Sequence, residues 1–458
     1  MIVKIQNLKV DELYGRYSYN ISFNPDVTFI YGENGCGKTT ILNITEAIIT
    51  GALYKLFQYK FSRIVLSYSS NSDLGEARQI TIRLMRKNFA VTFNGEEYTL
   101  KRDAYDRWGF SGSGATRINE YYFGNNQFLG AIKDTFNYVY LPLNRSQNRK
   151  YDTSLNESGL MRNIHMHQFY AFTDDEEDNE TTYLSSIDQA IELIRKNQIW
   201  VNSRIRRIND SFRNKILKAL LESNTSTEMK DLVAIIHESE TKAQLERIRD
   251  TYIAIMQEIV SVSSKEVQTY RKYFDDFIEM YLSYKAEEPH NAISADLLLK
   301  YQNVKKTERL VRIAEEAEAQ KREVQKPLEL FLSTMNEFIG NGEEKKQLRI
   351  DPEGNIYMIT RHKDEKIRLQ YMSSGEKQLL TFFAHLIFGV RRGQPGIFVV
   401  DEPELSLHLS WQKMFVEKAL GVNGNIQLIF ATHSPEIIGR YRSKMFKLTK
   451  EHVSEKSE

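Results

Sequence analysis

Residues 31–40 of the chain are Tyr-Gly-Glu-Asn-Gly-Cys-Gly-Lys-Thr-Thr, and they fit the pattern G-x-x-x-x-G-K-[ST] from Gly32 to Thr39. The apolar run Val27–Ile30 precedes this stretch, and isoleucines at helical spacing follow it. We therefore expect a strand, a glycine loop and a helix. The glycines allow several backbone N–H groups to face one point, and the helix start adds its positive end, so the loop suits phosphate groups.

The loop predicts a nucleotide site whose cofactors are ATP and Mg²⁺. Lys38 is expected to neutralise the β- and γ-phosphates, and the Thr39 hydroxyl is expected to bind Mg²⁺. The alternative is a glycine-rich turn before an ordinary helix, but strand, spacing, lysine and threonine together favour nucleotide binding. The residues expected to contact the nucleotide are Gly32, Asn34, Gly35, Cys36, Gly37, Lys38, Thr39 and Thr40.

Composition narrows the class of protein. The 458 residues are 41% hydrophobic and 27% charged, with a net charge of +1, which indicates two or three domain-sized units and excludes a strongly basic nucleic-acid arm as the main feature. Cys36 is the single cysteine, so no intrachain disulfide can form and a reducing cytoplasm is expected. The longest apolar stretch, Leu379–Val390, is shorter than a membrane span, and the N-terminus lacks a signal-peptide pattern. We expect a soluble cytoplasmic protein without a membrane partner.

The pattern of apolar residues divides the chain into three expected parts: an N-terminal ATPase lobe at 1–155, an inserted helical domain at 156–340 and a C-terminal ATPase lobe at 341–458. Short strands are expected at 1–10, 19–23, 63–67, 79–84, 89–93, 138–141, 348–350 and 356–360. Pro327 should end or kink a long helix that begins at Leu299. Heptads are not sustained, so we expect a helical hairpin or small bundle and not a long coiled-coil arm.

One helical segment of the expected insertion is amphipathic and strongly basic. Apolar residues recur at helical spacing from Ile205 to Leu220, and the opposite face carries Arg204, Arg206, Arg207, Arg213 and Lys215. A solvated basic face is the favoured interpretation, and a contact with a nucleic-acid backbone is the alternative.

Two carboxylates end the apolar run Ile397–Val400, which suits a buried parallel strand. Asp401 is expected to hold Mg²⁺, and Glu402, one residue later, is the candidate general base for the attacking water. A second such strand, 426–431, leads to His433, which we expect to contact the γ-phosphate.

A third motif, Met372–Glu376, precedes the apolar helix. Ser373 and Glu376 have the spacing of a capping box, which needs no ligand, but small residues before a helix also offer free N–H groups to a phosphate.

Together these motifs resemble an ABC-class ATPase head of the RecF, SMC and OLD type. The phosphate loop, the signature-like Met372–Glu376, the pair Asp401 and Glu402, and His433 occur in the order of that family. The resemblance implies an α/β fold in which a mixed or parallel P-loop sheet joins an antiparallel β lobe and carries an inserted helical domain. It also implies face-to-face homodimers or higher oligomers, in which Ser373, Gly375 and Glu376 contact ATP held by the partner.

The family also has a glutamine that senses Mg²⁺. Gln147 is the first candidate for it and Gln127 the second. Ser374 replaces the first glycine of the commonest signature, and we do not expect this change to abolish function.

The biological role is less well defined by the sequence. Little chain follows Ser434 and Pro435, and His165 and His167 lack acidic partners at a metal-site spacing, so we expect no nuclease within this chain. The size and insertion resemble stand-alone ATPases of the bacterial anti-phage systems Septu and PARIS. That resemblance implies control of a separate effector, such as a nuclease, by an oligomeric ATPase. The alternative is a RecF-like clamp on duplex DNA; a transporter engine is disfavoured by the continuation of the acidic strand.

Overall fold

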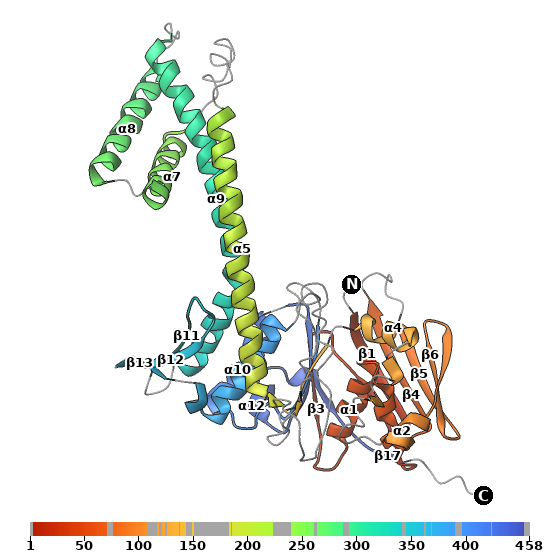
Figure 1. Cartoon of the computed structure of the whole chain (residues 1–458). Helices are drawn as coiled ribbons and strands as arrows, with labels where there is room; N and C mark the ends of the chain where they lie inside the picture. Colours follow the sequence, from red (N-terminus) through yellow and green to blue (C-terminus); the bar gives the residue numbers. More distant parts are fainter. Residues whose placement is uncertain are drawn as a thin grey trace, which may run out of the picture. The chain divides into compact units, whose positions relative to one another are not determined.

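A computed structural model describes the protein as two compact units, Met1–Gln198 with Pro327–Glu458, and Ile199–Lys326 (Figure 1). We call them the ATPase unit and the helical unit. The described residues are 3–70, 77–108, 117–118, 121–123, 126–136, 138–142, 149–150, 183–184, 186–222, 240–260, 263–286, 293–340, 345–360, 363–367, 369–389, 396–422 and 424–452.

A five-stranded parallel sheet is the centre of the ATPase unit. Its order is β16-β3-β15-β14-β8, and every neighbouring pair is parallel. The bounds are β16 (Met445–Lys447), β3 (Val27–Tyr31), β15 (Ile426–Ala431), β14 (Gly396–Asp401) and β8 (Tyr138–Pro142). β15 is buried along its whole length, as expected for a parallel strand that is covered on both faces.

The two faces of this sheet belong to different hydrophobic cores. Ile397 and Val399 of β14 contribute to a core that contains the helix α1 (Lys38–Ile49), whereas Phe398 and Val400 contribute to a core that contains α10 (Ser374–Phe388). This alternation follows from the two-residue period of a strand. The second core also includes residues of α11 (Leu409–Val422) and α12 (Pro435–Ile438).

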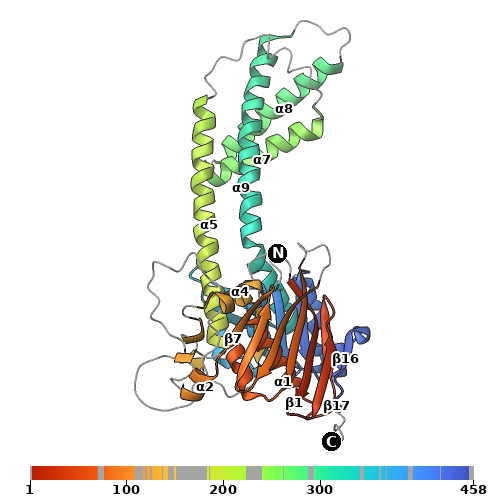
Figure 2. The same ribbon diagram turned by 90° about the vertical axis from the view of Figure 1, so that its right-hand side faces the viewer.

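An antiparallel seven-stranded sheet packs against α1 in the first of these two cores (Figures 1 and 2). Its order is β17-β2-β1-β4-β5-β6-β7. Asn94 and Gly95 have φ angles of 50° and 82° and form the hairpin turn between β6 and β7. The strands are β17 (Glu451–His452), β2 (Tyr17–Ser22), β1 (Val3–Leu13), β4 (Arg63–Ser70), β5 (Arg78–Met85), β6 (Asn88–Phe93) and β7 (Glu96–Leu100).

A buried glutamine joins the two large sheets. Gln427 of β15 is fully buried, and its amide oxygen accepts a 2.8 Å hydrogen bond from the N–H of Ile5 in β1. Its amide nitrogen donates to the carbonyls of Ile5 and Asn24, each at 2.8 Å. The β1–β4 register shifts between Ile5 and Asn7, so the chain is irregular where Gln427 binds it.

Smaller elements complete the ATPase unit. A three-stranded antiparallel sheet has the order β11-β12-β13, and Asn336 holds its first strand by bonding both the N–H and the carbonyl of Leu348, at 2.7 and 3.2 Å. The elements are β11 (Lys346–Ile350), β12 (Ile356–Thr360), β13 (Lys363–Ile367), β9 (Arg149–Lys150), β10 (Tyr183–Leu184), η1 (Leu53–Gln58), α2 (Asp103–Trp108), α4 (Gln127–Thr135), η2 (Leu369–Tyr371) and η3 (Arg442–Lys444). These layers confirm the predicted α/β class.

The helical unit contains α7 (Lys242–Val260), α8 (Ser264–Ala286) and parts of the longer helices α5 (Ser186–Glu222) and α9 (Ala295–Ile339) (Figure 2). Residues of α7, α8 and α9 share one hydrophobic core. Pro327 was expected to end or kink the helix, and it does not end it: α9 continues through the proline. A proline costs the helix one backbone hydrogen bond, and the apolar residues Phe331, Met335 and Phe338 beyond it are anchored in the second core.

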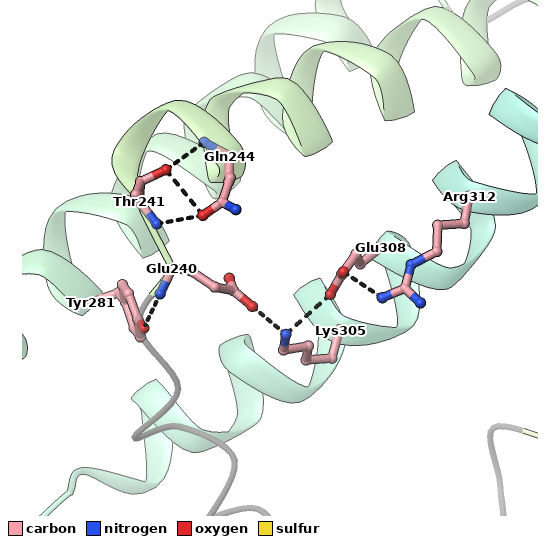
Figure 3. Close-up of polar contacts among 7 residues, drawn as sticks. All are labelled: Glu240, Thr241, Gln244, Tyr281, Lys305, Glu308 and Arg312. Carbon is pink, nitrogen blue, oxygen red and sulfur yellow. Dashed lines mark hydrogen bonds and ion pairs between the residues drawn. The ribbon is translucent and has the colours of Figure 1, made fainter.

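Polar contacts fix the start of α7 against the bundle (Figure 3). Lys305 of α9 donates to Glu240 and, at 3.1 Å, to Glu308, while Arg312 donates to Glu308 at 2.7 Å. The N–H of Glu240 also donates to the hydroxyl of Tyr281. Burial by itself lowers the pKa of Lys305, but the hydrogen bonds to its two carboxylates outweigh burial and raise it. Lys305 therefore stays charged and links Glu240, just before α7, to α9.

Candidate functional site

The glycine loop lies between β3 and α1, as the sequence predicts. Gly35 and Gly37 have φ angles of 75° and 102°, a left-handed conformation that a residue with a side chain adopts only at a cost. A Cβ on Gly32 would lie 2.7 Å from the sulfur of Cys36, so this position also has no room for a side chain. Gly37 is the N-cap of α1 and supplies no side-chain cap, which leaves the first N–H groups of the helix for a ligand.

Two side chains hold the loop closed. Lys38 is 8% exposed as a residue, and its ammonium donates to the carbonyls of Gly32 and Glu33 at 3.0 and 3.3 Å. The hydroxyl of Tyr19 donates to the carbonyl of Cys36 at 3.0 Å. Burial raises the pKa of Tyr19 to about 12, so its hydroxyl keeps its proton and remains a donor at neutral pH. The charge of Lys38 is thus held at the loop whose phosphates it is predicted to neutralise.

The structure brings Thr39 and Asp401 together although they are 362 positions apart in the chain. The Thr39 hydroxyl donates to a carboxylate oxygen of Asp401 at 2.9 Å. Burial is the main factor that raises the pKa of Asp401 above its usual value, and the hydrogen bond from Thr39 opposes that rise. Hydroxyl and carboxylate oxygens are ligands that Mg²⁺ prefers, so this pair fits the predicted metal ion.

The strand order puts His433 at the same edge of the sheet as the glycine loop and Asp401. β15 lies between β3 and β14, so His433, just beyond β15, follows the same edge of the sheet as the glycine loop and Asp401. Carboxyl ends of parallel strands are where open α/β sheets bind ligands. Glu402 adopts a φ of 49°, and its N–H donates to Ala431 at 2.8 Å, which ties the acidic turn to the end of β15. The His433 side chain is exposed.

Sequence reasoning assigned no role to Glu404, which the structure places against the histidine turn. Its two carboxylate oxygens accept hydrogen bonds from the Thr432 hydroxyl at 2.8 Å and from the His433 N–H at 2.7 Å. The only signal in the sequence was its position in the acidic run Asp401–Glu404. A carboxylate that binds two adjacent donors fixes the backbone that carries them.

The signature-like motif forms the predicted capping box at the start of α10. The Ser373 hydroxyl accepts from the N–H of Glu376, and the Glu376 carboxylate accepts from the N–H of Ser373 at 2.6 Å. The other carboxylate oxygen of Glu376 is 3.3 Å from the ammonium of Lys346. Ser373 and Ser374 are exposed, whereas Gly375 is buried. A Cβ on Gly375 would lie only 2.4 Å from the carbonyl oxygen of Ser406, so its lack of a side chain already has a structural reason.

The candidates for the magnesium-sensing glutamine remain open. Gln147, like His165 and His167, lies outside the described residues. Gln127 is exposed at the first position of α4. Among the described residues, no group of three or more His, Cys, Asp or Glu side chains is suited to hold a metal ion. Thr39 and Asp401 are the residues at this edge that would hold a Mg²⁺ ion.

Comparison with known proteins identifies the family. Residues 3–438 match the family of the AAA ATPase domain (AAA_15). The chain belongs to this family. The match includes the glycine loop, the acidic pair and His433, and it confirms the prediction of an ATPase domain. The parallel P-loop sheet and the antiparallel lobe agree with the predicted α/β fold of a P-loop ATPase.

One curated relative of this AAA ATPase is the Retron Vc95 probable ATPase of Vibrio cholerae serotype O1 biovar El Tor. The two are 26% identical over 141 residues, which cover 29% of this chain and about a quarter (26%) of the relative. Solved structures with some similarity to this chain include the Smc head domain of Pyrococcus furiosus bound to the C-terminal domain of ScpA, with a TM-score of 0.42, 14% identity and coverage of 98% and 96%. The Smc head domain with coiled coil and joint of Pyrococcus yayanosii has a TM-score of 0.38, 15% identity and coverage of 99% and 97%.

None of the helices in the described ranges has the length and apolar character needed to cross a membrane.

Proposed function

We propose that this AAA ATPase domain binds ATP with Mg²⁺ and hydrolyses it at the edge of the parallel sheet. The contact between Thr39 and Asp401 carries the proposal, because it joins the phosphate loop to the acidic strand at one point. Lys38 then neutralises the β- and γ-phosphates. Mg²⁺, held by Thr39 and Asp401, supplies charge stabilisation for the phosphoryl oxygens.

Glu402 and His433 are assigned to the attacking water and the γ-phosphate. Glu402 follows the metal-binding Asp401 directly, and as a general base it accepts a proton from the water. His433 reaches the γ-phosphate from the neighbouring strand end. Positioning and charge stabilisation dominate phosphoryl transfer, so small displacements of either side chain should lower the rate strongly.

The proposed active unit is a dimer with shared sites. Ser373 is exposed, and so are three large apolar side chains: Tyr371, two residues before it, is 70% accessible, and Leu405 and Leu409, in and after the turn that follows the acidic pair, are 40% and 52% accessible. Leu405 is next to Ser406, whose carbonyl touches Gly375, so the signature and this turn form one surface. A second copy, related by a two-fold axis, would cover these apolar side chains. Ser373 of one copy would then contact the ATP bound by the other copy.

A mixing experiment tests the shared site. Lys38→Ala removes the phosphate-binding lysine, and Ser373→Arg blocks the signature surface, so each variant alone should be inactive. Random pairing makes half of the dimers mixed, and each mixed dimer has one intact site of two, so we expect about a quarter of the wild-type rate. Mixing Lys38→Ala with a chain that carries both substitutions is the matched control and should give none. Equal rates in the two mixtures would refute the shared site.

We further propose that the ATP-dependent oligomer controls a separate effector, a nuclease, in bacterial anti-phage defence. The resemblance to stand-alone defence ATPases supports this role, and so does the relative named as a retron ATPase. The experiment is purification of the tagged chain together with the protein encoded beside it, with and without ATP. An ATP-dependent complex is expected; a neighbour that encodes a permease would contradict the proposal.

A RecF-like clamp on duplex DNA is the second candidate. The observation that favours it is the exposure of Arg204, Arg206, Arg207, Arg213 and Lys215 along α5. Such a face would bind the phosphate backbone, and its affinity would fall steeply with salt. Binding of bare duplex that is lost when these arginines are replaced would favour the clamp over the defence role.

A further inference from the structure

The turn 403–407, which follows the acidic pair, is bound on one side to the histidine turn. Both carboxylate oxygens of Glu404 are committed there, to the Thr432 hydroxyl at 2.8 Å and the His433 N–H at 2.7 Å. A charged acceptor makes stronger hydrogen bonds than a neutral one, and two bonds from one carboxylate restrict both translation and rotation of the turn. The backbone of His433 therefore moves together with Glu404.

A second side chain doubles this connection. Gln412 of α11 donates its amide N–H groups to the carbonyls of Leu407 and Glu404, at 3.0 and 3.4 Å. Its amide oxygen accepts from the Ser434 hydroxyl at 2.6 Å, one residue after the histidine. Ser434 also caps α12, so the whole histidine turn is anchored.

On its other side the same turn touches the signature helix α10. Gln378 donates to the carbonyl of Pro403 at 2.8 Å. The carbonyl of Ser406 lies where the Cβ of a side chain on Gly375 would be, so the backbones of the turn and of α10 are in close contact. Ser406 has a φ of 69°, which shows that the turn is held in an uncommon conformation at this contact. The turn 403–407 thus lies between His433 and the signature.

We propose that Glu404 is a positioning residue for His433, whose backbone it holds through the two hydrogen bonds of its carboxylate. This proposal rests on the proposed ATPase function with shared sites. In such a dimer, His433 serves the nucleotide of its own chain, whereas Ser373 serves the nucleotide of the partner.

A double-mutant cycle measures whether Glu404 acts through His433. Glutamine keeps one acceptor oxygen, so Glu404→Gln loses at least one of the two hydrogen bonds. We expect kcat to fall about 10- to 100-fold and KM for ATP to change less than about twofold, because the glycine loop is untouched. In a His433→Ala background the same change should cost less than about twofold. Effects that multiply in the double variant would overturn the proposal.

Two controls separate positioning from general damage. Glu417→Gln neutralises an exposed carboxylate of α11 that is 3.5 Å from Arg440, and it should leave kcat unchanged. Thr432 offers a conservative pair: Thr432→Val keeps the shape but removes the hydroxyl and should slow turnover, whereas Thr432→Ser keeps the donor and should restore most of the rate. A valine variant as active as the serine variant would count against the role of this bond.

Amide hydrogen exchange tests the connection without any need for turnover. Glu404→Ala removes the acceptor of the His433 N–H, so the peptide around 432–434 should exchange at least about tenfold faster, while the exchange of α1 stays unchanged. Unchanged exchange at 432–434 would overturn the proposal even in a chain that hydrolyses no ATP. Absence of ATP hydrolysis by the wild-type chain, with fast exchange in the variant, would instead overturn only the proposed function.

Discussion

His385, on the signature helix α10, should make the stability of the protein depend on pH. The side chain is 1% exposed, and one ring nitrogen lies 2.7 Å from the carbonyl oxygen of Thr381. Burial lowers the pKa of His385 to about 4 from the model-peptide value of 6.5, with the hydrogen bond opposing the shift. The folded chain therefore keeps this histidine neutral where the unfolded chain protonates it.

The magnitude follows from the two pKa values. Between pH 6.5 and about 4 the unfolded state binds more protons than the folded state, so the stability contributed by neutral His385 is lost as pH falls through this window. At about pH 5 the pH is about 1.5 units below the pKa of the histidine in the unfolded chain. At about 1.4 kcal/mol per unit, the free energy of unfolding is then about 2 kcal/mol lower than at neutral pH. Above pH 6.5 the contribution no longer changes, because both states are neutral.

The assay is urea unfolding at about pH 7.5 and about pH 5, for the wild type and for His385→Gln, which keeps an amide donor but does not titrate. The wild type should lose about 2 kcal/mol more than the variant between the two conditions. His385→Phe, a second variant without a titrating group, should show the same reduced dependence whatever its absolute stability. If both variants lose as much free energy of unfolding as the wild type, His385 is not the group that senses pH.

Two further substitutions test the packing around the site. Gln427→Leu removes the buried amide that bonds Ile5 and Asn24, and urea unfolding should show a loss of about 3 kcal/mol because the backbone groups stay buried without partners; a loss below about 1 kcal/mol would contradict the role of this joint. Gly375→Ala places a methyl group against the turn 403–407 and should lower ATP turnover at least about tenfold, whereas Gly421→Ala, whose Cβ would meet nothing within 4 Å, is the matched control. Equal activity of the two alanine variants would show that the turn 403–407 can move to accommodate the methyl group without loss of activity.

Local patterns were sufficient for the motifs themselves. The glycine loop, the apolar strand before Asp401 and the capping box of Ser373 and Glu376 each depend on residues close together in the chain, so spacing alone predicts them. At Pro327 local rules left open whether the helix ends or kinks; α9 continues, and the apolar residues beyond the proline pack into the second core.

The catalytic roles assigned to Glu402 and His433 stay predictions, as do the boundaries of the three sequence-based domains. The structure divides the chain at Ile199 and Lys326, within the long helices α5 and α9. Helical periodicity continues across such a boundary, so it cannot show where one packing unit gives way to the next.

By itself the sequence determined that this protein has a phosphate-binding loop, a buried acidic strand and a helix start suited to the signature, because each is encoded within a few neighbouring residues. Only the tertiary structure decided which of them meet. The strand order β16-β3-β15-β14-β8 brings Thr39 to Asp401 and gives Glu404 its two donors beside His433. Hydrogen bonds from one side chain to a distant backbone have no periodicity in the chain, so they appear only when the strands are placed side by side.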